Sequence, residues 1–449
     1  MWSISFWAAS RQRIFLWVAG LSWVTASRIG KKYRGGKKVK GLKGYRDHGV
    51  NSLARDFNAA ALWAGLTTFV WFASGMVPLQ IAVSSELGLD PAQSSSSIFI
   101  VWLSAALSSI VLSAYYRQPI PITWTIPGLI YLGTLAGQFT FSELVGANLL
   151  AGFLIVVLGL LGIGGRIMDW IPLPVVMGMF AGSVLSYVTR MVKETVEELA
   201  IAGPTVAGYL LGKLIGSPRV PPMGIAIIFG GSAVFLTRQI APSSVSWGLP
   251  ALVIPEIDFS LSAFIAVSLP MLVLSMVLGN VQGLGFLLVQ GYPVPVRPVT
   301  VLVGLSSILN AMLGGYPAIV GRTAVAILAA PDAGPASGRY VGSLFAAALT
   351  VTLALAASPV TSFIAILPHS YVLVLAGLAI LSSLQEAFER AFNSQLRFGA
   401  LVAFIVAATP FTLAGITSAF WAIIAGLLGS LLSERSALQA YWREKGFNE

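Results

Sequence analysis

"YRQPIPITWTIPGLIYLGTLAG", residues 116–137, has the pattern of a membrane segment whose helix starts only halfway along. Pro119 and Pro121 exclude a regular helix at the beginning of the stretch, whereas residues 122–125 (ITWT) favour an extended strand. Pro127 suits the first turn of a helix, because the N–H that it lacks would have no partner there. We therefore predict a short extended segment followed by a short helix at residues 127–138.

A second stretch, "LGGYPAIVGRTAVAILAAP" at residues 313–331, repeats this pattern. Pro317 corresponds to Pro121, and after a short extended part we predict a helix at 322–331, with Arg322 and Thr323 in its first turn. Interrupted segments at matching positions of two halves indicate the substrate site of an inverted-repeat transporter.

The composition is that of a membrane protein. Of the 449 residues, 56% are hydrophobic and 10% are charged, whereas a soluble protein carries about 25% charged residues. We predict an all-α polytopic membrane protein with about 14 transmembrane segments in two inverted seven-helix repeats, with half-helices at segments 3 and 10. The predicted helices cover residues 59–83, 95–115, 127–138, 142–164, 171–190, 199–215, 222–240, 261–288, 298–313, 322–331, 339–357, 360–383, 397–412 and 414–433.

The basic residues indicate the orientation in the membrane. The net charge is +10, and 12 of the 27 lysines and arginines lie in residues 1–58. Such a run more often faces anionic lipid than nucleic acid, so we expect a basic cytoplasmic segment without stable order. The bias of basic residues toward the inner loops places both termini, including the tail of residues 434–449, in the cytoplasm of a bacterial inner-membrane protein. The inner loops carry Arg117, Arg166, Lys213, Arg219, Arg297, Arg339, Arg390 and Arg397, and the outer loops carry Arg190, Lys193 and Arg238.

Several kinds of chemistry lack the residues they need. The chain has no cysteine, and its two histidines, His48 and His369, lie far apart in the sequence. A metal site or a Ser/His/Asp triad is therefore not expected. No glycine-rich nucleotide motif follows a predicted strand. We expect neither an enzyme nor a bound cofactor.

Arg322 is the residue that most directly suggests a ligand. It lies in an apolar stretch, and no Asp or Glu lies in the interior of any predicted span, although a charge within a membrane needs a partner or a function. We expect the N-termini of the two half-helices to meet and, with the guanidinium fork of Arg322, to bind a small anionic substrate. Gly321, Thr323, Thr125 and Pro127 would line this site. The alternative is that Arg322 caps backbone carbonyls or extends to the membrane interface.

Three neutral amides are further candidates for the substrate site. Asn280 and Gln282 lie in the glycine-rich segment 261–288, where they could orient a carboxylate or form hydrogen bonds between helices. Gln80 follows a proline in the first segment and is expected to face the bundle.

The acidic residues do not point to a proton carrier. Glu386 and Arg390 are predicted to lie in an interfacial helix between two spans. Because no predicted span contains an interior carboxylate, these residues do not support proton coupling. The substrate could carry the proton itself, or the protein could exchange anions.

Three stretches resemble the benzoate/proton symporter (BenE-like) family: "YRQPIPITWTIPG", "SMVLGNVQGLGFLLVQGYPVPVRPVTVLVGLSSILNAMLGGY" and "GITSAFWAIIAGLL". The resemblance covers most of residues 58–433 and implies the fold of the uracil and SulP transporters. In that fold a core domain (about 59–165 and 261–357) moves against a gate domain (about 171–240 and 360–433), and dimers through the gate are common. It also implies uptake of benzoate or a similar aromatic carboxylate with protons.

Arg322 and Gln80 resemble residues of the SulP carriers more than typical BenE-like residues. The tenth helix of SulP carriers opens with a serine–arginine pair, and a glutamine of their first segment lies at the anion site. A SulP-like inorganic anion transporter or an anion exchanger is therefore the alternative. The expected partners are a small anionic substrate, membrane lipid and a second copy of the chain, but not nucleic acid.

Overall fold

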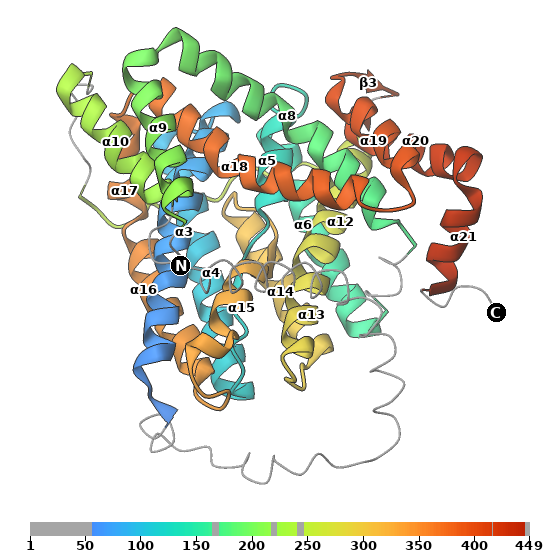
Figure 1. Ribbon diagram of the computed structural model, residues 1–449, viewed down its shortest axis with the longest axis horizontal. Coiled ribbons are helices and arrows are strands. Elements are labelled where there is room, and N and C mark those ends of the chain that lie inside the picture. Colours follow the sequence, from blue (N-terminus) through green and yellow to red (C-terminus); the bar gives the residue numbers. More distant parts are fainter. Residues whose placement is uncertain (1–55, 164–169, 217–221, 240–246, 415, 445–449) are drawn as a thin grey trace, which may run out of the picture.

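The computed structural model describes residues 56–163, 170–216, 222–239, 247–414 and 416–444, which form one body of packed helices (Figure 1). The basic segment predicted for residues 1–58 falls almost wholly outside the described residues, and so do Arg166 and Arg219 of the inner loops.

One group of helices comes from two separate parts of the chain. The first part forms α3 (Ala59–Glu86), α4 (Pro91–Tyr116), α5 (Ile126–Thr134) and α6 (Phe141–Leu161). The second part begins with a continuous helical run, α11 (Leu261–Ala263), η1 (Phe264–Ser268), α12 (Leu269–Val273), η2 (Leu274–Val281) and α13 (Gln282–Val289). It continues with α14 (Val296–Met312), α15 (Arg322–Leu328), η3 (Pro331–Ala333), α16 (Arg339–Leu355) and α17 (Ala357–Ala365). The two parts interlock, because α14 packs on α6 and α16 packs on α3 and α4.

The remaining helices form a band across the top and right of Figure 1. They are α8 (Leu173–Glu197), α9 (Leu199–Ile215), α10 (Pro222–Thr237), α18 (His369–Phe392), α19 (Arg397–Ala408), α20 (Ser418–Ser433) and α21 (Arg435–Glu444). Within the band α18 and α19 pack on α8, α10 packs on α9, and α20 packs on α19. The band meets the first group where α18 packs on α3 and where α5 packs on α8.

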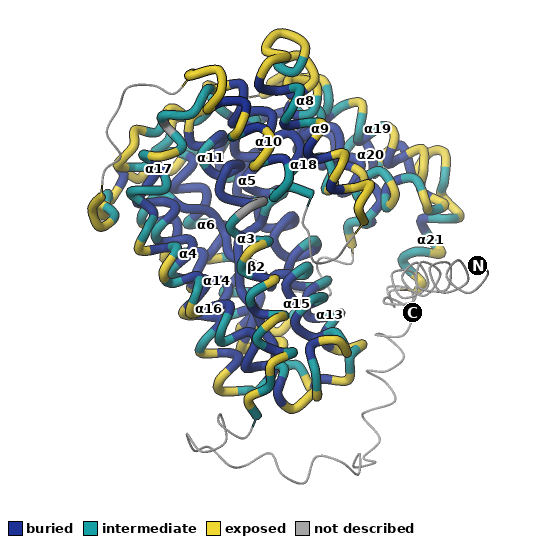
Figure 2. Tube along the Cα trace, turned by 60° about the vertical axis from the view of Figure 1, so that its left-hand side comes forward, coloured by how far each residue is buried: buried dark blue, intermediate teal, exposed yellow. Residues whose placement is uncertain are grey.

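The helices have the length and composition of membrane spans. Among the described residues, 6 helices are long and apolar enough to cross a membrane, or up to 7 if the bent pair α16 and α17 counts as one span. Five shorter apolar helices, including α9, α14 and α20, accompany them. The expectation of a mostly helical, polytopic membrane protein is confirmed at this level. Figure 2 shows the buried residues concentrated where the helices pack together.

Prolines explain why two of the predicted helices have wrong boundaries. The helix predicted at 360–383 is two helices: α17 is bent by 63° from α16, and α18 starts only at His369 and runs to Phe392. Pro368 disfavours helical geometry in the residue before it, which separates the two. In the same way Pro410 ends α19 at Ala408, and a short hairpin of β3 (Thr412–Leu413) and β4 (Ile416–Thr417) precedes α20.

The two interrupted segments pair with each other. The predicted extended parts form β1 (Ile122–Trp124) and β2 (Ala318–Val320), an antiparallel ribbon with Ile122 opposite Val320 and Trp124 opposite Ala318. Each strand leads into its predicted short helix, α5 or α15. These expectations are confirmed.

The ribbon nevertheless separates the N-termini of the two half-helices, which we expected to meet. The amide N of Thr125 donates to the Pro317 carbonyl, whereas the amide N of Gly321 donates to the Pro121 carbonyl at the other end of the ribbon. Four residues of strand separate these ends, or about 13 Å. Antiparallel pairing therefore places the start of α5 and the start of α15 at opposite ends.

Side chains bind three of the outward-facing N–H groups of the ribbon. The N–H of Ile122 donates to Ser109 Oγ at 2.7 Å. The N–H of Ala318 donates to Ser307 Oγ at 2.9 Å, and that of Val320 donates to Asn280 Oδ1 at 2.9 Å. All six strand residues are buried, where an unpaired N–H would be costly. Polar residues of α4, η2 and α14 thus form hydrogen bonds to both edges of the ribbon, which would be unpaired if it were isolated.

Candidate functional site

Arg322 is the first residue of α15, directly after the N-cap Gly321. Its Nη1 and Nη2 atoms bond to the two carboxylate oxygens of Glu386 on α18, and Nη1 also donates to Gln282 Oε1 at 3.1 Å. The side chains of Arg322 and Glu386 are 30% and 28% exposed, so solvent reaches the ion pair. The expectation that Arg322 has no carboxylate partner is wrong.

A second arginine shares the same carboxylate. Arg390 lies one turn after Glu386 on α18, and its Nε atom is 2.8 Å from Glu386 Oε1. We call Arg322, Gln282, Glu386 and Arg390 the Arg322 cluster. With its carboxylate ionised, the cluster carries a net charge of +1. An anion can therefore be attracted to it although one carboxylate is already present.

The α13 side of the cluster offers an unused donor and free space. The Nε2 atom of Gln282 is buried and has no hydrogen-bond partner among the described residues. Gly285 lies on the same face of α13, three residues further on, and a Cβ atom added there would meet nothing within 4 Å. Gly279 and Gly283, by contrast, pack directly on β2. The open side of α13 thus lies beside Arg322.

The other predicted site residues lie at the opposite end of the ribbon. Thr125 is the N-cap of α5, and its hydroxyl accepts a hydrogen bond from Gly128 N at 3.1 Å, with Pro127 in the first turn. Gln80 is buried, donates to the Tyr316 hydroxyl and accepts from Trp102 Nε1 at 2.8 Å.

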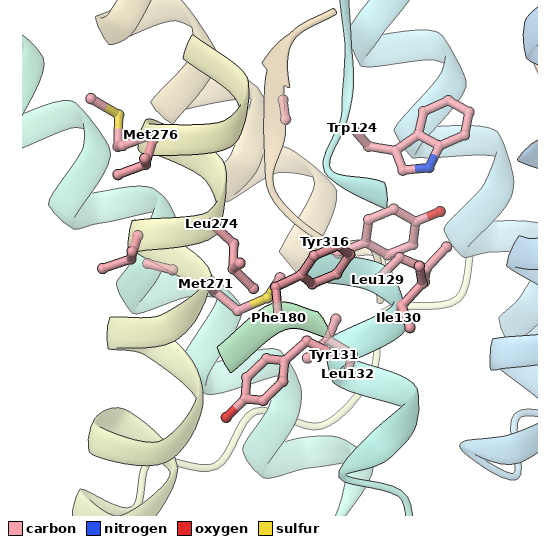
Figure 3. Packing of buried hydrophobic residues seen from close by; sticks show 14 of the residues in the cluster. Trp124, Leu129, Ile130, Tyr131, Leu132, Phe180, Met271, Leu274, Met276 and Tyr316 are labelled. Carbon is pink, nitrogen blue, oxygen red and sulfur yellow. The ribbon is translucent and has the colours of Figure 1, made fainter. Parts of the chain in front are cut away.

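Apolar side chains surround this end of the ribbon. Figure 3 shows Trp124, Leu129, Phe180, Met271 and Tyr316 packed together near the start of α5. All five are buried, and Phe180 is contributed by α8 of the helical band. The structure therefore brings Gly321, Arg322, Thr323 and Gln282 together at one end and Thr125, Pro127 and Gln80 at the other. Asn280 lies at the Arg322 end, where its Oδ1 accepts a hydrogen bond from the amide N of Val320, the residue before Gly321.

Sequence reasoning missed Glu386 for a reason that the helix boundaries make clear. The predicted helix ended at residue 383, which left Glu386 in an interfacial segment, whereas α18 continues to Phe392. Glu386 is 64 residues from Arg322 in the sequence. The spacing of Glu386 and Arg390, four residues apart, was the only local sign of an ion pair.

A separate cavity of about 380 Å³ opens beside the C-terminal end of α5. Its lining includes Tyr131, Ser183 and Thr417, together with Glu86 and Arg190. Glu86 joins α3 to α8, because its carboxylate accepts from the Tyr187 hydroxyl at 2.5 Å and from Arg190 Nη1 at 2.7 Å. None of the residues predicted for the substrate site is part of this lining.

Solved structures of anion transporters share this fold. The transmembrane domain of a cyanobacterial bicarbonate transporter, BicA, matches with a TM-score of 0.54 and 14% identity, covering 82% of this chain and 97% of that one. SLC26A9 matches with a TM-score of 0.57 and 14% identity, covering 85% of this chain and 67% of that one. Murine Slc26a9, an anion transporter in the inward-facing state, matches with a TM-score of 0.56 and 13% identity, covering 91% and 75%.

Proteins related in sequence identify the family, which the shared fold alone does not. The chain is 30% identical to the inner membrane protein YdcO of Escherichia coli K12 over 343 residues, or 76% of this chain and 87% of that protein. It is 24% identical to the benzoate membrane transport protein of Acinetobacter baylyi over 383 residues, or 84% of this chain and 96% of that protein. The benzoate membrane transport protein family, BenE, matches residues 55–432. The chain therefore belongs to the BenE family of membrane transporters, and it is not an enzyme.

Proposed function

We propose that the protein is a secondary active transporter of small organic anions in the bacterial inner membrane, with benzoate or a similar aromatic carboxylate as substrate and Arg322 as its anion ligand. One observation carries this assignment. Arg322 holds the Glu386 carboxylate through both arms of its guanidinium. A substrate carboxylate would take the same place, because planar bidentate pairing suits any carboxylate.

The surroundings of Arg322 suit an aromatic acid. Gln282 can add a hydrogen bond through its unused Nε2 donor. The free space beside Gly285 would receive the ring. The helix dipole contributes little, since α15 has only 7 residues, so the charge of Arg322 itself provides most of the attraction.

Transport would require that the helices move relative to each other. In our proposal about 14 segments form two inverted repeats, the core comprises about 59–165 and 261–357, and the gate comprises about 171–240 and 360–433. Arg322 belongs to the core and Glu386 to the gate. The pair would therefore break and form again as the core moves, which links substrate binding to the motion.

An inorganic anion is the second candidate. The fold likeness to the bicarbonate transporter BicA and to SLC26A9 favours it, and bicarbonate also presents two oxygens in a plane. The two candidates differ in the use that they make of the space beside Gly285, because a small inorganic anion has no ring to place there.

Replacement of Arg322 tests the assignment. In purified protein, Arg322→Gln should weaken benzoate binding about tenfold to hundredfold, since it removes a charge-assisted hydrogen bond of ~1.5–3 kcal/mol. Arg322→Lys keeps the charge without the fork and should retain part of the affinity. Arg397→Gln is the matched control, because among the described residues the Arg397 side chain bonds only to the Ser394 carbonyl just before α19. Binding is measured by calorimetry and uptake by counter-flow in proteoliposomes with benzoate, sulfate and bicarbonate. Normal benzoate affinity in folded Arg322→Gln would refute the proposed function.

A further inference from the structure

The Arg322–Glu386 pair contains an acceptor that the substrate must displace. Both oxygens of Glu386 are bonded to Arg322, so no arm of the fork is left for a second carboxylate. We propose that Glu386 is a built-in competitor of the substrate for Arg322, and that it takes up a proton when the substrate displaces it. This role rests on the function proposed above for Arg322.

The geometry makes displacement feasible. Glu386 belongs to α18 and Arg322 to α15, so the ion pair links two helices that are not neighbours in the sequence. Both side chains are partly exposed, at 28% and 30%, and a solute can therefore approach them. Arg322 also keeps its hydrogen bond to Gln282, which can hold the guanidinium in place while the carboxylates exchange.

Few charged groups influence Glu386. Among the described residues, the charges that act on it are those of Arg322 on α15 and Arg390 on α18. On the outer face of α18, Glu389 bonds to Gln385 instead.

The helices that pack on α18 carry their other ionisable groups elsewhere. Glu86 of α3 and Arg190 of α8 pair at the His369 end of α18, about 25 Å along the helix from Glu386. Arg397, at the start of α19, bonds to the Ser394 carbonyl. The electrostatic surroundings of Glu386 therefore change when it loses one of these two arginines.

The charges balance if one proton accompanies one substrate. In the empty cluster two guanidinium groups face one carboxylate, and the net charge is +1. When a substrate carboxylate binds Arg322, Glu386 keeps only Arg390. The substrate also brings a second negative charge close to it in a partly buried place, and like charges favour the neutral acid. A proton from water then binds the Glu386 carboxylate and forms the neutral acid. The loaded cluster again carries +1, and release of substrate and proton on the other side lets Glu386 return to Arg322.

Calorimetry can count this proton directly. Benzoate binding to purified protein is measured at about pH 7 in two buffers of different ionisation enthalpy, and the difference gives the number of protons taken up. Benzoate stays ionised at this pH, since simple carboxylic acids have a pKa of about 4. We expect about one proton per benzoate in the wild type and none in Glu386→Gln. Because its competitor has been removed, Glu386→Gln should also bind benzoate about tenfold more tightly.

Two variants complete the experiment. Glu389→Gln is the matched control on the same helix and should behave as the wild type. Glu386→Asp keeps the charge on a shorter side chain, so it should bind more tightly than the wild type and still take up a proton. Thermal unfolding in detergent checks that each variant is folded. If Glu386→Gln does not fold, the wild-type proton count and Glu386→Asp decide the question.

The outcomes separate the two proposals. If the wild type binds benzoate without proton uptake, or Glu386→Gln takes up as many protons as the wild type, the role of Glu386 is refuted while Arg322 can remain the anion ligand. If Arg322→Gln binds benzoate normally, the proposed function itself fails.

Discussion

Buried polar side chains determine where the residues around the ribbon lie. Gln80 uses both ends of its amide, one for Trp102 and one for Tyr316, and Asn310 Nδ2 donates to the Tyr316 carbonyl at 2.9 Å. These bonds are made in a buried environment, where a lost partner leaves a costly unpaired group. At its present position, Gln80 therefore supports the start of β2.

Replacement of Gln80 should reduce stability. Gln80→Ala leaves the Trp102 indole N–H and the Tyr316 hydroxyl without their partner, and we expect a loss of ~1–3 kcal/mol in the free energy of unfolding. Denaturant or thermal unfolding in detergent measures it, with the exposed Gln138→Ala as control. If stability is unchanged and benzoate affinity falls, Gln80 binds substrate instead of supporting the ribbon.

At the scale of elements, the glycines of the helical run from α11 to α13 have two different roles. A Cβ atom at Gly279 would lie 2.5 Å from the Cβ atom of Ile319, so this glycine allows the helix to approach β2 closely. Gly285 has open space beside it. The same run therefore packs on the ribbon at one point and leaves room next to Arg322 at another.

Leucine at these two positions should give opposite results. Gly279→Leu must displace β2 or the helix, and it should lower the melting temperature or prevent folding. Gly285→Leu should fold normally but reduce benzoate uptake, because it fills the space proposed for the ring, while bicarbonate uptake changes less. Melting curves and proteoliposome uptake measure both effects. Unchanged benzoate uptake in Gly285→Leu would place the ring elsewhere.

At the scale of the whole molecule, the orientation in the membrane can be tested by cysteine labelling without reaction at native cysteines. The chain has no cysteine, and the run Leu261–Val289, of 29 residues, separates the exposed Glu256 from the exposed Arg297. Such a run is about 43 Å long and can cross a layer of about 30 Å. Glu256 and Arg297 should therefore lie on opposite sides.

Single cysteines at the two positions report the orientation. Glu256→Cys should react with an impermeant maleimide on intact cells, whereas Arg297→Cys should react only after the membrane is permeabilised. Arg397→Cys is the control for the inner side, because the positive-inside bias puts it with Arg297. Labelling of Arg297→Cys from outside would reverse the orientation predicted for the termini.

Local chemistry was enough to determine the class and the interrupted segments of this protein. The low fraction of charged residues requires a membrane environment. Pro121 and Pro317 stop a helix wherever they occur, because proline lacks the N–H and clashes with the preceding turn. The extended stretches and short helices at both places followed from these residues alone.

Only the tertiary structure decided how these segments pair and which residues they contact. The register of β1 and β2 separates the two half-helix N-termini, and no local preference encodes the pairing of strands that lie almost two hundred residues apart. The partner of Arg322 comes from a helix 64 residues away. Whether a charged side chain is free or paired depends on long-range packing, and so Arg322 looked isolated in the sequence although it binds a carboxylate in the fold.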